Sequence, residues 1–289
     1  MAKPFFLWAL QAPTLLNLLE GTNQWTIATS SLTEDNFAEK ALTKVPWWDG
    51  KCRPDFFVGC NTEHHRWAFY NLQGVPRFHA IHHCDAAEMG SPTGQDCIAF
   101  QERGIRLLKD HHTIKSAHYL SLYYEPKPTW KWQSNTPIAI MSRPWHRRAS
   151  TVARQELLKY NLKSLSLYGE GQPGGFLFET DKRRVMTDCS CYIAMVGETG
   201  GFGLSEHEAM AMGCPVVARR WGDMQDRFPG YPGFAESDED LKDLACRCSQ
   251  DQSFAESLSR MCLDYVAAYH TRERFEESVT SLIAFATKA

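Results

Sequence analysis

The fold of this chain is decided by residues 197–218, which read Gly197-Glu198-Thr199-Gly200-Gly201-Phe202-Gly203-Leu204-Ser205-Glu206-His207-Glu208-Ala209-Met210-Ala211-Met212-Gly213-Cys214-Pro215-Val216-Val217-Ala218. The four glycines between positions 197 and 203 predict a loop whose backbone N–H groups can approach a ligand closely. An apolar strand from Tyr192 precedes this loop, and a helix is expected from about Leu204 or Ser205 to Gly213, a residue suited to the left-handed C-terminal position. Pro215 then opens a second strand, so the run predicts one parallel crossover unit.

The start of this helix is an expected anion site. Its first N–H groups have no partner inside the helix, and the aligned peptide dipoles place partial positive charge at that end. A diphosphate fits such a site.

Glu208 lies four residues after Leu204 and four before Met212, so all three share one face of the predicted helix. Two interpretations remain open for its carboxylate. Ser205 and Glu208 have the spacing of a capping box, which needs no ligand. Alternatively Glu208 contacts a ligand, and the glycine loop in front of the helix favours this interpretation.

Composition indicates a globular protein of two modest domains, with 289 residues, 43% hydrophobic and 22% charged. The ten cysteines are scattered and no secretory signal precedes them, so we expect a reduced, cytoplasmic protein. The pairs Cys189/Cys191 and Cys246/Cys248 lack a histidine in zinc-finger register, so no structural metal is expected. The apolar run from Pro4 is too short to span a bilayer.

Charge disfavours a protein whose whole surface binds nucleic acid, because the net charge is −3. Local basic clusters occur only in the half that contains the glycine loop, where they predict an anion-binding cleft: Arg143/Arg147/Arg148/Arg154, Lys182/Arg183/Arg184 and Arg219/Arg220.

From about Pro137 the chain alternates between predicted strands and helices, which favours a doubly wound parallel sheet. The segment between Tyr168 and Asp188 is instead turn-rich and basic, and three helices close the chain. The first half contains short β-rich runs. Between the halves, the proline-bounded and polar segment 126–137 indicates a linker, so we expect an N-terminal domain over residues 1–130 and a C-terminal domain over 131–289. The strands expected are Phe5–Leu10, Thr26–Ala28, Asp55–Cys60, Arg77–His82, Cys97–Phe100, Tyr119–Tyr124, Ile138–Met141, Ser164–Tyr168, Tyr192–Val196 and Pro215–Ala218. The helices expected are Ser150–Tyr160, Ser205–Met212, Asp238–Cys248, Ser253–Tyr269 and Thr271–Ala286.

The second half resembles the donor-binding domain of GT-B glycosyltransferases, most closely the retaining family 4. The matching residues are Gly201-Phe202-Gly203-Leu204, Glu208-Ala209-Met210-Ala211 and Gly213-x-Pro215-Val216-Val217-Ala218. The resemblance implies an α/β protein of two Rossmann-like domains with a cleft between them. The N-terminal domain would be small and divergent, and the last helix would pack back on it.

In similar enzymes the glycine loop and the helix N-terminus bind the donor diphosphate, and the helix glutamate holds the ribose hydroxyls. The resemblance thus assigns the ribose to Glu208 and counts Gly169 as donor-binding. It assigns the diphosphate to Gly200, Gly201, Phe202, Gly203, Leu204 and Ser205.

Similar enzymes also flank the diphosphate with a Gly-Arg pair and a later lysine. Here Ser142-Arg143 stands at the first place and Arg148 at the second. Because arginine keeps the positive charge and adds a planar fork, stabilisation of the leaving group would survive. The alternative is that Arg147 and Arg148 face solvent before a helix.

Two places depart from the family pattern. The family commonly has a second glutamate eight residues before the helix glutamate, where it contacts the transferred sugar, and this chain has Gly200 there. Glu198, two residues earlier, takes that role only if the extra glycine lets the loop bulge. In the first half, His82 or His83 is a candidate for the histidine that lies beside the sugar in similar enzymes, although histidine-rich loops are often polar surface.

We therefore expect a glycosyltransferase that moves a sugar from a nucleotide diphosphate sugar, with UDP-sugars favoured, to an acceptor hydroxyl with retention. No cofactor or metal is expected, because the acidic triplet Asp238-Glu239-Asp240 is typical of a helix first turn. A glycan or small molecule is the preferred acceptor. The alternatives are a virus-type DNA base glycosyltransferase, where aromatic side chains stack on an extruded base, and a non-catalytic nucleotide-binding relic of the fold.

Overall fold

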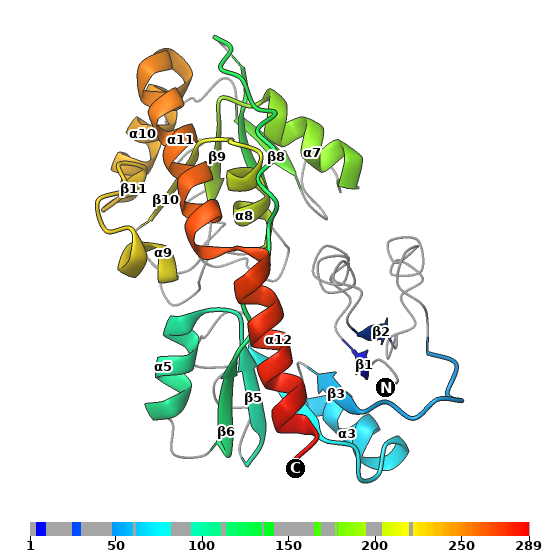
Figure 1. The fold of residues 1–289 in the computed structure, drawn as a ribbon. Helices are drawn as coiled ribbons and strands as arrows, with labels where there is room; N and C mark the ends of the chain where they lie inside the picture. Colours follow the sequence, from blue (N-terminus) through cyan, green and yellow to red (C-terminus); the bar gives the residue numbers. More distant parts are fainter. Residues whose placement is uncertain are drawn as a thin grey trace. The chain divides into compact units, whose positions relative to one another are not determined.

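The computed structural model describes the chain as two units, each with its own parallel sheet (Figure 1). Unit 1 comprises Met1–Tyr123 and Arg272–Ala289, and unit 2 comprises Tyr124–Thr271. The residues that the structure describes are 4–9, 25–29, 48–59, 62–81, 94–110, 114–134, 136–141, 165–168, 177, 179–194, 204–219 and 222–288.

Unit 1 contains a six-stranded sheet in the order β2-β1-β3-β4-β5-β6, and all neighbouring strands are parallel. The first half of the chain is thus an α/β unit, in which α3 connects β3 to β4 and α5 connects β5 to β6. Its elements are β1 (Phe5–Trp8), β2 (Thr26–Thr29), β3 (Phe56–Gly59), α3 (Thr62–Asn71), β4 (Arg77–Ile81), β5 (Asp96–Ala99), α5 (Glu102–Asp110), β6 (Ser116–Tyr119) and α12 (Arg272–Ala286).

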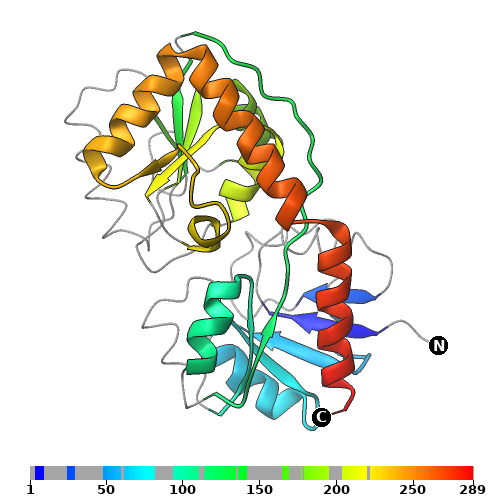
Figure 2. The same cartoon turned by 60° about the vertical axis from the view of Figure 1, so that its left-hand side comes forward.

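Both faces of this sheet are apolar, as expected for parallel strands covered by helices. On one face Phe6 stacks on Phe56 with ring centroids 4.8 Å apart. On the other face Leu7 and Phe57 pack with Ala68 of α3. Figure 2 shows α12 on one side of the sheet and α5 on the other.

Helix α12 belongs to unit 1, although it is the last helix of the chain. Its Phe275 ring lies 5.7 Å from the Trp25 ring, and its Phe285 ring lies 4.2 Å from the His118 ring. The apolar stripe of α12 is therefore covered by the sheet of unit 1.

Unit 2 contains a five-stranded parallel sheet in the order β11-β10-β9-β7-β8. The first strand of this unit, β7, lies between the second strand, β8, and the third strand, β9. The chain passes from β7 to one side and then returns to the other side for β9, which creates a topological switch point between β7 and β9. The elements of unit 2 are β7 (Ile138–Met141), β8 (Leu165–Tyr168), α7 (Glu179–Asp188), β9 (Cys191–Ala194), α8 (Leu204–Ala211), β10 (Val216–Arg219), α9 (Gly222–Arg227), β11 (Phe234–Ala235), α10 (Asp238–Gln250) and α11 (Gln252–Tyr269).

Several predicted elements differ from the structure. The segment before Asp188, expected to be turn-rich, contains α7. The last strand of unit 1 is β6, which ends at Tyr119, where we expected a strand to begin. Helices α3 and α5 were missed because the apolar residues of α3 are consecutive rather than helically spaced, and because α5 has only 9 residues. The helix expected over 150–160 lies outside the described residues.

The expected linker is part of unit 2, so the division falls after Tyr123 rather than after residue 130. Its backbone is held by unit 2, since the Lys127 N–H donates to the Ala211 carbonyl at 2.8 Å. The Trp130 ring is buried, and its Nε1–H donates to the Cys189 carbonyl at 2.7 Å. These bonds explain why a polar, proline-rich segment is fixed against unit 2.

Candidate functional site

The glycine loop and the Ser142-Arg143 pair follow the two strands that flank the switch point of unit 2. Strand β7 ends at Met141 and strand β9 ends at Ala194. Open α/β sheets bind ligands beyond the carboxyl ends of their strands at such a point. The described ends of β7 and β9 therefore lie where this fold offers a site, directly before the predicted donor residues in the sequence.

Most of the predicted site residues lie outside the described residues. They are Gly169, Gly200, Gly201, Phe202, Gly203, Glu198, Arg143 and Arg148 in the second half and His82 and His83 in the first. Leu204, Ser205 and Glu208 are described, and they form the fixed part of the candidate site.

Helix α8 begins at Leu204, directly after the glycine loop, and ends as the sequence predicts. Gly213 has φ 78°, the left-handed conformation that glycine adopts without strain. The Gly213 N–H donates to the Met210 carbonyl and the Cys214 N–H to the Ala209 carbonyl, both at 2.9 Å, which is the Schellman pattern. The C-terminal end of α8 is thus closed by a glycine cap before β10 begins.

Glu208 is paired with a cation that sequence reasoning did not connect with it. The Lys182 Nζ of α7 lies 2.5 Å from the Glu208 Oε2, and the two side chains are only 16% and 12% exposed. The basic cluster 182–184 was noticed in the sequence, but its spacing shows neither the helix α7 nor which of its cations turns inward.

The capping-box interpretation of Ser205 and Glu208 is wrong. Ser205 lies inside α8, and its hydroxyl donates to the Glu206 Oε2 at 3.0 Å and accepts from the Tyr192 hydroxyl at 3.2 Å. Glu208 instead binds Lys182. The Glu208 carboxylate thus has a partner within the protein, and its contact with a ligand stays a prediction.

The Tyr192 hydroxyl stays protonated beneath α8. Burial raises the pKa of Tyr192 well above its usual range, and the nearby carboxylates of Glu206 and Glu208 raise it further. The hydroxyl is therefore a permanent hydrogen-bond donor to Ser205. This contact anchors the first turn of α8 to the central strand β9.

His207 fixes the buried side of α8. Its ring stacks on the Tyr124 ring, with centroids 5.4 Å apart and planes at 13°, and meets the His270 ring edge-on at 4.4 Å. The Tyr124 N–H donates to the His270 carbonyl at 3.1 Å. The two segments through which the chain enters and leaves unit 2 are thus joined against α8.

Unit 1 holds a second histidine pair that the sequence analysis missed. The Nδ1 of His79 on β4 lies 3.1 Å from the Nε2 of His65 on α3, and the rings stack at 5.0 Å. Burial, and then the nearby His79, lower the pKa of His65 to about 4, so its ring is neutral near pH 7. The pair lies beside Gly59, where a Cβ would come within 3.3 Å of the His65 Nε2.

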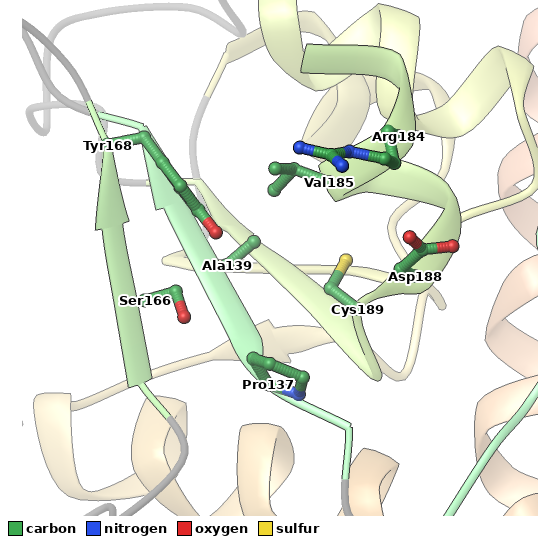
Figure 3. A pocket seen from close by; sticks show the side chains of 8 residues that line it. All are labelled: Pro137, Ala139, Ser166, Tyr168, Arg184, Val185, Asp188 and Cys189. Atoms are coloured by element: carbon green, nitrogen blue, oxygen red, sulfur yellow. The ribbon is translucent and has the colours of Figure 1, made fainter. Parts of the chain in front are cut away.

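A pocket of about 210 Å³ lies between α7 and the strands β7 and β8 (Figure 3). Its walls are formed by Pro137, Ala139, Ser166, Tyr168, Arg184, Val185, Asp188 and Cys189. The C-terminal end of α7 and the Asp188 carboxylate place negative charge there, next to the positive charge of Arg184. The predicted donor residues that the structure describes do not line this pocket.

The acidic triplet 238–240 is the first turn of α10, as predicted. Ser237 is the N-cap, its side chain accepts from the Asp240 N–H, and the Asp240 side chain returns the bond in a capping box. Asp238 pairs with Arg219 at 2.8 Å. The carboxylates of Asp238 and Asp240 thus have partners within the protein.

Comparison with solved structures shows the same two-unit architecture elsewhere. Sucrose-phosphate synthase from Thermosynechococcus elongatus is 12% identical with a TM-score of 0.66, covering 99% of both chains. HepE from Anabaena in complex with UDP-glucose is 13% identical with a TM-score of 0.66, covering 98% of this chain and 100% of that chain.

A mutant of TarM from S. aureus, in complex with fondaparinux, alpha-GlcNAc-glycerol and UDP, is 15% identical with a TM-score of 0.61. The match covers 79% of this chain, which spans 55% of the TarM chain. No protein-family model matches the sequence, and no sequence relative is found among curated proteins. At these identities the likeness shows the fold. Among the helices that the structure describes, none has the length and apolar character needed to cross a bilayer.

Proposed function

This chain has the GT-B fold, and we propose that it is a glycosyltransferase that uses a nucleotide diphosphate sugar, with UDP-sugars favoured. One observation carries the proposal: the glycine loop precedes the N-terminus of α8 beside the switch point of unit 2, and α8 also carries Glu208, which pairs with Lys182 of α7. The UDP-glucose complex of HepE, which has the same fold, supports the choice of donor.

In the proposed donor complex, the diphosphate lies at the first N–H groups of α8, where the helix dipole favours negative charge. Glu208 accepts hydrogen bonds from the ribose hydroxyls. Arg143 and Arg148 supply further positive charge as the diphosphate departs. Because removal of one such preorganised donor typically costs about 10²–10³ in kcat, each arginine is expected to have a large effect on the rate.

The proposed reaction retains the anomeric configuration and needs no metal ion. The bond between the anomeric carbon and the phosphate oxygen breaks, the acceptor oxygen bonds to the same face of the sugar, and its proton passes to the departing phosphate oxygen. Glu198 is the candidate contact to the sugar in place of the glutamate that Gly200 replaces, and His82 or His83 is the candidate on the acceptor side.

A glycan or small molecule is the proposed acceptor, and a cytoplasmic location is part of the proposal. The described cysteines 52, 97, 189, 191, 214, 246, 248 and 262 are free thiols, which supports a reducing compartment.

The proposal is tested by release of nucleotide diphosphate. Wild type is incubated with UDP-, GDP- and ADP-sugars and with candidate glycan, small-molecule and hydroxymethylated DNA acceptors, and the freed diphosphate is measured. We expect release from one donor class, increased by a glycan or small molecule and strongly reduced in Glu208→Ala. The matched control is Glu256→Ala, which removes an exposed carboxylate from α11.

Tight nucleotide binding without any release would contradict the catalytic proposal and favour a binding protein. Stimulation by hydroxymethylated DNA alone would replace the proposed acceptor.

A further inference from the structure

We propose that Lys182 is a positioning residue of the donor site, which holds the Glu208 carboxylate for the ribose diol and so sets a preference for ribonucleotides over 2′-deoxyribonucleotides. The inference rests on the proposed donor site and adds a residue from α7 to it. It starts from the ion pair between the two helices.

The pair joins two separate elements beside the switch point. Lys182 lies in the first half of α7, and Glu208 lies in the middle of α8. With 16% and 12% exposure, both side chains are largely removed from water, so their attraction is screened less than that of a surface pair. The Lys182 ammonium therefore fixes the direction of the carboxylate more firmly than an exposed lysine would.

A second carboxylate lies in the surroundings of Glu208. Glu206, two residues earlier, is a second carboxylate and is only 6% exposed. Both carboxylates act on the pKa of the Tyr192 hydroxyl, so both lie near that group. Neighbouring carboxylates disfavour each other's ionised form, and a nearby cation opposes this effect. Lys182 places its positive charge at Glu208, and a charged carboxylate only accepts hydrogen bonds.

This acceptor character matches a diol. A carboxylate offers about four acceptor positions on its two oxygens, so an ammonium at Oε2 is compatible with hydroxyl donors to the same group. A ribose provides two adjacent hydroxyls, whereas a 2′-deoxyribose provides one. The loss of one hydrogen bond to a fixed, charged acceptor is expected to weaken binding by about 10-fold or more.

The position along α8 favours the ribose over the diphosphate as the partner. Glu208 follows Leu204 by four residues, which places it about 6 Å along the helix axis from the first turn. The diphosphate is expected at that first turn, so Lys182, in contact with Glu208, lies beyond it. A ribose is the next group of the nucleotide.

Calorimetric titration of the full chain with UDP and with 2′-deoxy-UDP tests the inference. Wild type is expected to prefer UDP by about 10-fold or more. Lys182→Met is expected to reduce this preference to about 3-fold or less, and Lys182→Arg to restore most of it, because the charge is retained. In a Glu208→Gln background, Lys182→Met is expected to leave the UDP preference unchanged, because Lys182 acts through Glu208.

The control is Arg184→Met, which removes a more exposed cation from the same helix, where it pairs with Asp181. It is expected to keep the wild-type preference. If Lys182→Met does not fold, Lys182→Gln takes its place, since it also removes the charge.

Three results would overturn the inference. Lys182→Met could weaken the binding of UDP and of 2′-deoxy-UDP equally, or leave both affinities unchanged. It could also reduce the preference for UDP as strongly in the Glu208→Gln background as in wild type. Each would show that Lys182 does not orient Glu208. A wild type that binds no nucleoside diphosphate is a different result, because it would contradict the proposed function itself.

Discussion

Breaking the Lys182–Glu208 pair from one side is expected to destabilise the protein, whereas removing both partners is not. At 2.5 Å and an effective dielectric constant of about 20, the gross attraction is roughly 7 kcal/mol, and desolvation of the two ions offsets most of it. Leaving one charge without its partner in a fully buried site costs about 3–5 kcal/mol. The residual exposure of 16% and 12% lowers the expected cost of Lys182→Met or Glu208→Met to about 2–3 kcal/mol.

Urea unfolding followed by tryptophan fluorescence at pH 7 measures this cost, with Arg184→Met as the exposed control. The double variant Lys182→Met/Glu208→Met is expected within about 1 kcal/mol of wild type, because two apolar side chains replace the two ions. If each single variant lies within about 0.5 kcal/mol of wild type, the pair is not held as tightly as its geometry indicates, and the reasoning fails.

Three further predictions concern stability and pH. Gly213→Ala should cost about 1 kcal/mol or more in thermal unfolding, because φ is 78° and a Cβ would lie 3.3 Å from the Ser259 Oγ; an unchanged Tm would refute the left-handed cap. Ser237→Ala should lower the free energy of unfolding in urea by about 1 kcal/mol, because it removes the N-cap of α10. An unchanged free energy of unfolding would show that the cap is not formed. His65 has a folded pKa of about 4 against an ordinary 6.5, so the unfolded chain binds its proton first and stability falls as the pH drops from about 6.5 towards 4. His65→Gln should flatten that part of the curve of unfolding free energy against pH. If the curves of wild type and His65→Gln stay parallel across this range, the low pKa is contradicted.

The elements around α8 were predictable because their signals are local. Gly213 predicts a left-handed helix end from its own residue type, and the structure has it. The strands on either side of α8 were placed to within a residue or two, since short apolar runs with turn residues at both ends leave few alternatives. The acidic first turn of α10 follows from charge at a helix start.

The contacts that complete the site were not predictable, because they join residues distant in the sequence. Lys182 meets Glu208 only because α7 and α8 both flank β9. His207 was read as one residue of a helical motif, yet it packs against Tyr124 and His270 from the two ends of unit 2. No local sequence pattern predicts such tertiary contacts.

The boundary between the units also depends on tertiary contacts. The composition of segment 126–137 is typical of a linker, but Trp130 finds a buried hydrogen-bond partner in Cys189 and ties the segment to unit 2. Burial of one tryptophan outweighs the local preference of the prolines for an extended linker.

One measurement tests the proposed nucleotide site at α8 most directly: calorimetric titration of wild type and Glu208→Ala with UDP. We expect saturable binding at one site per chain, weakened by about 10-fold or more in Glu208→Ala because hydrogen bonds to a charged acceptor are lost. Wild type that binds neither UDP nor GDP nor ADP, or a Glu208→Ala variant that binds UDP as tightly as wild type, would contradict the account.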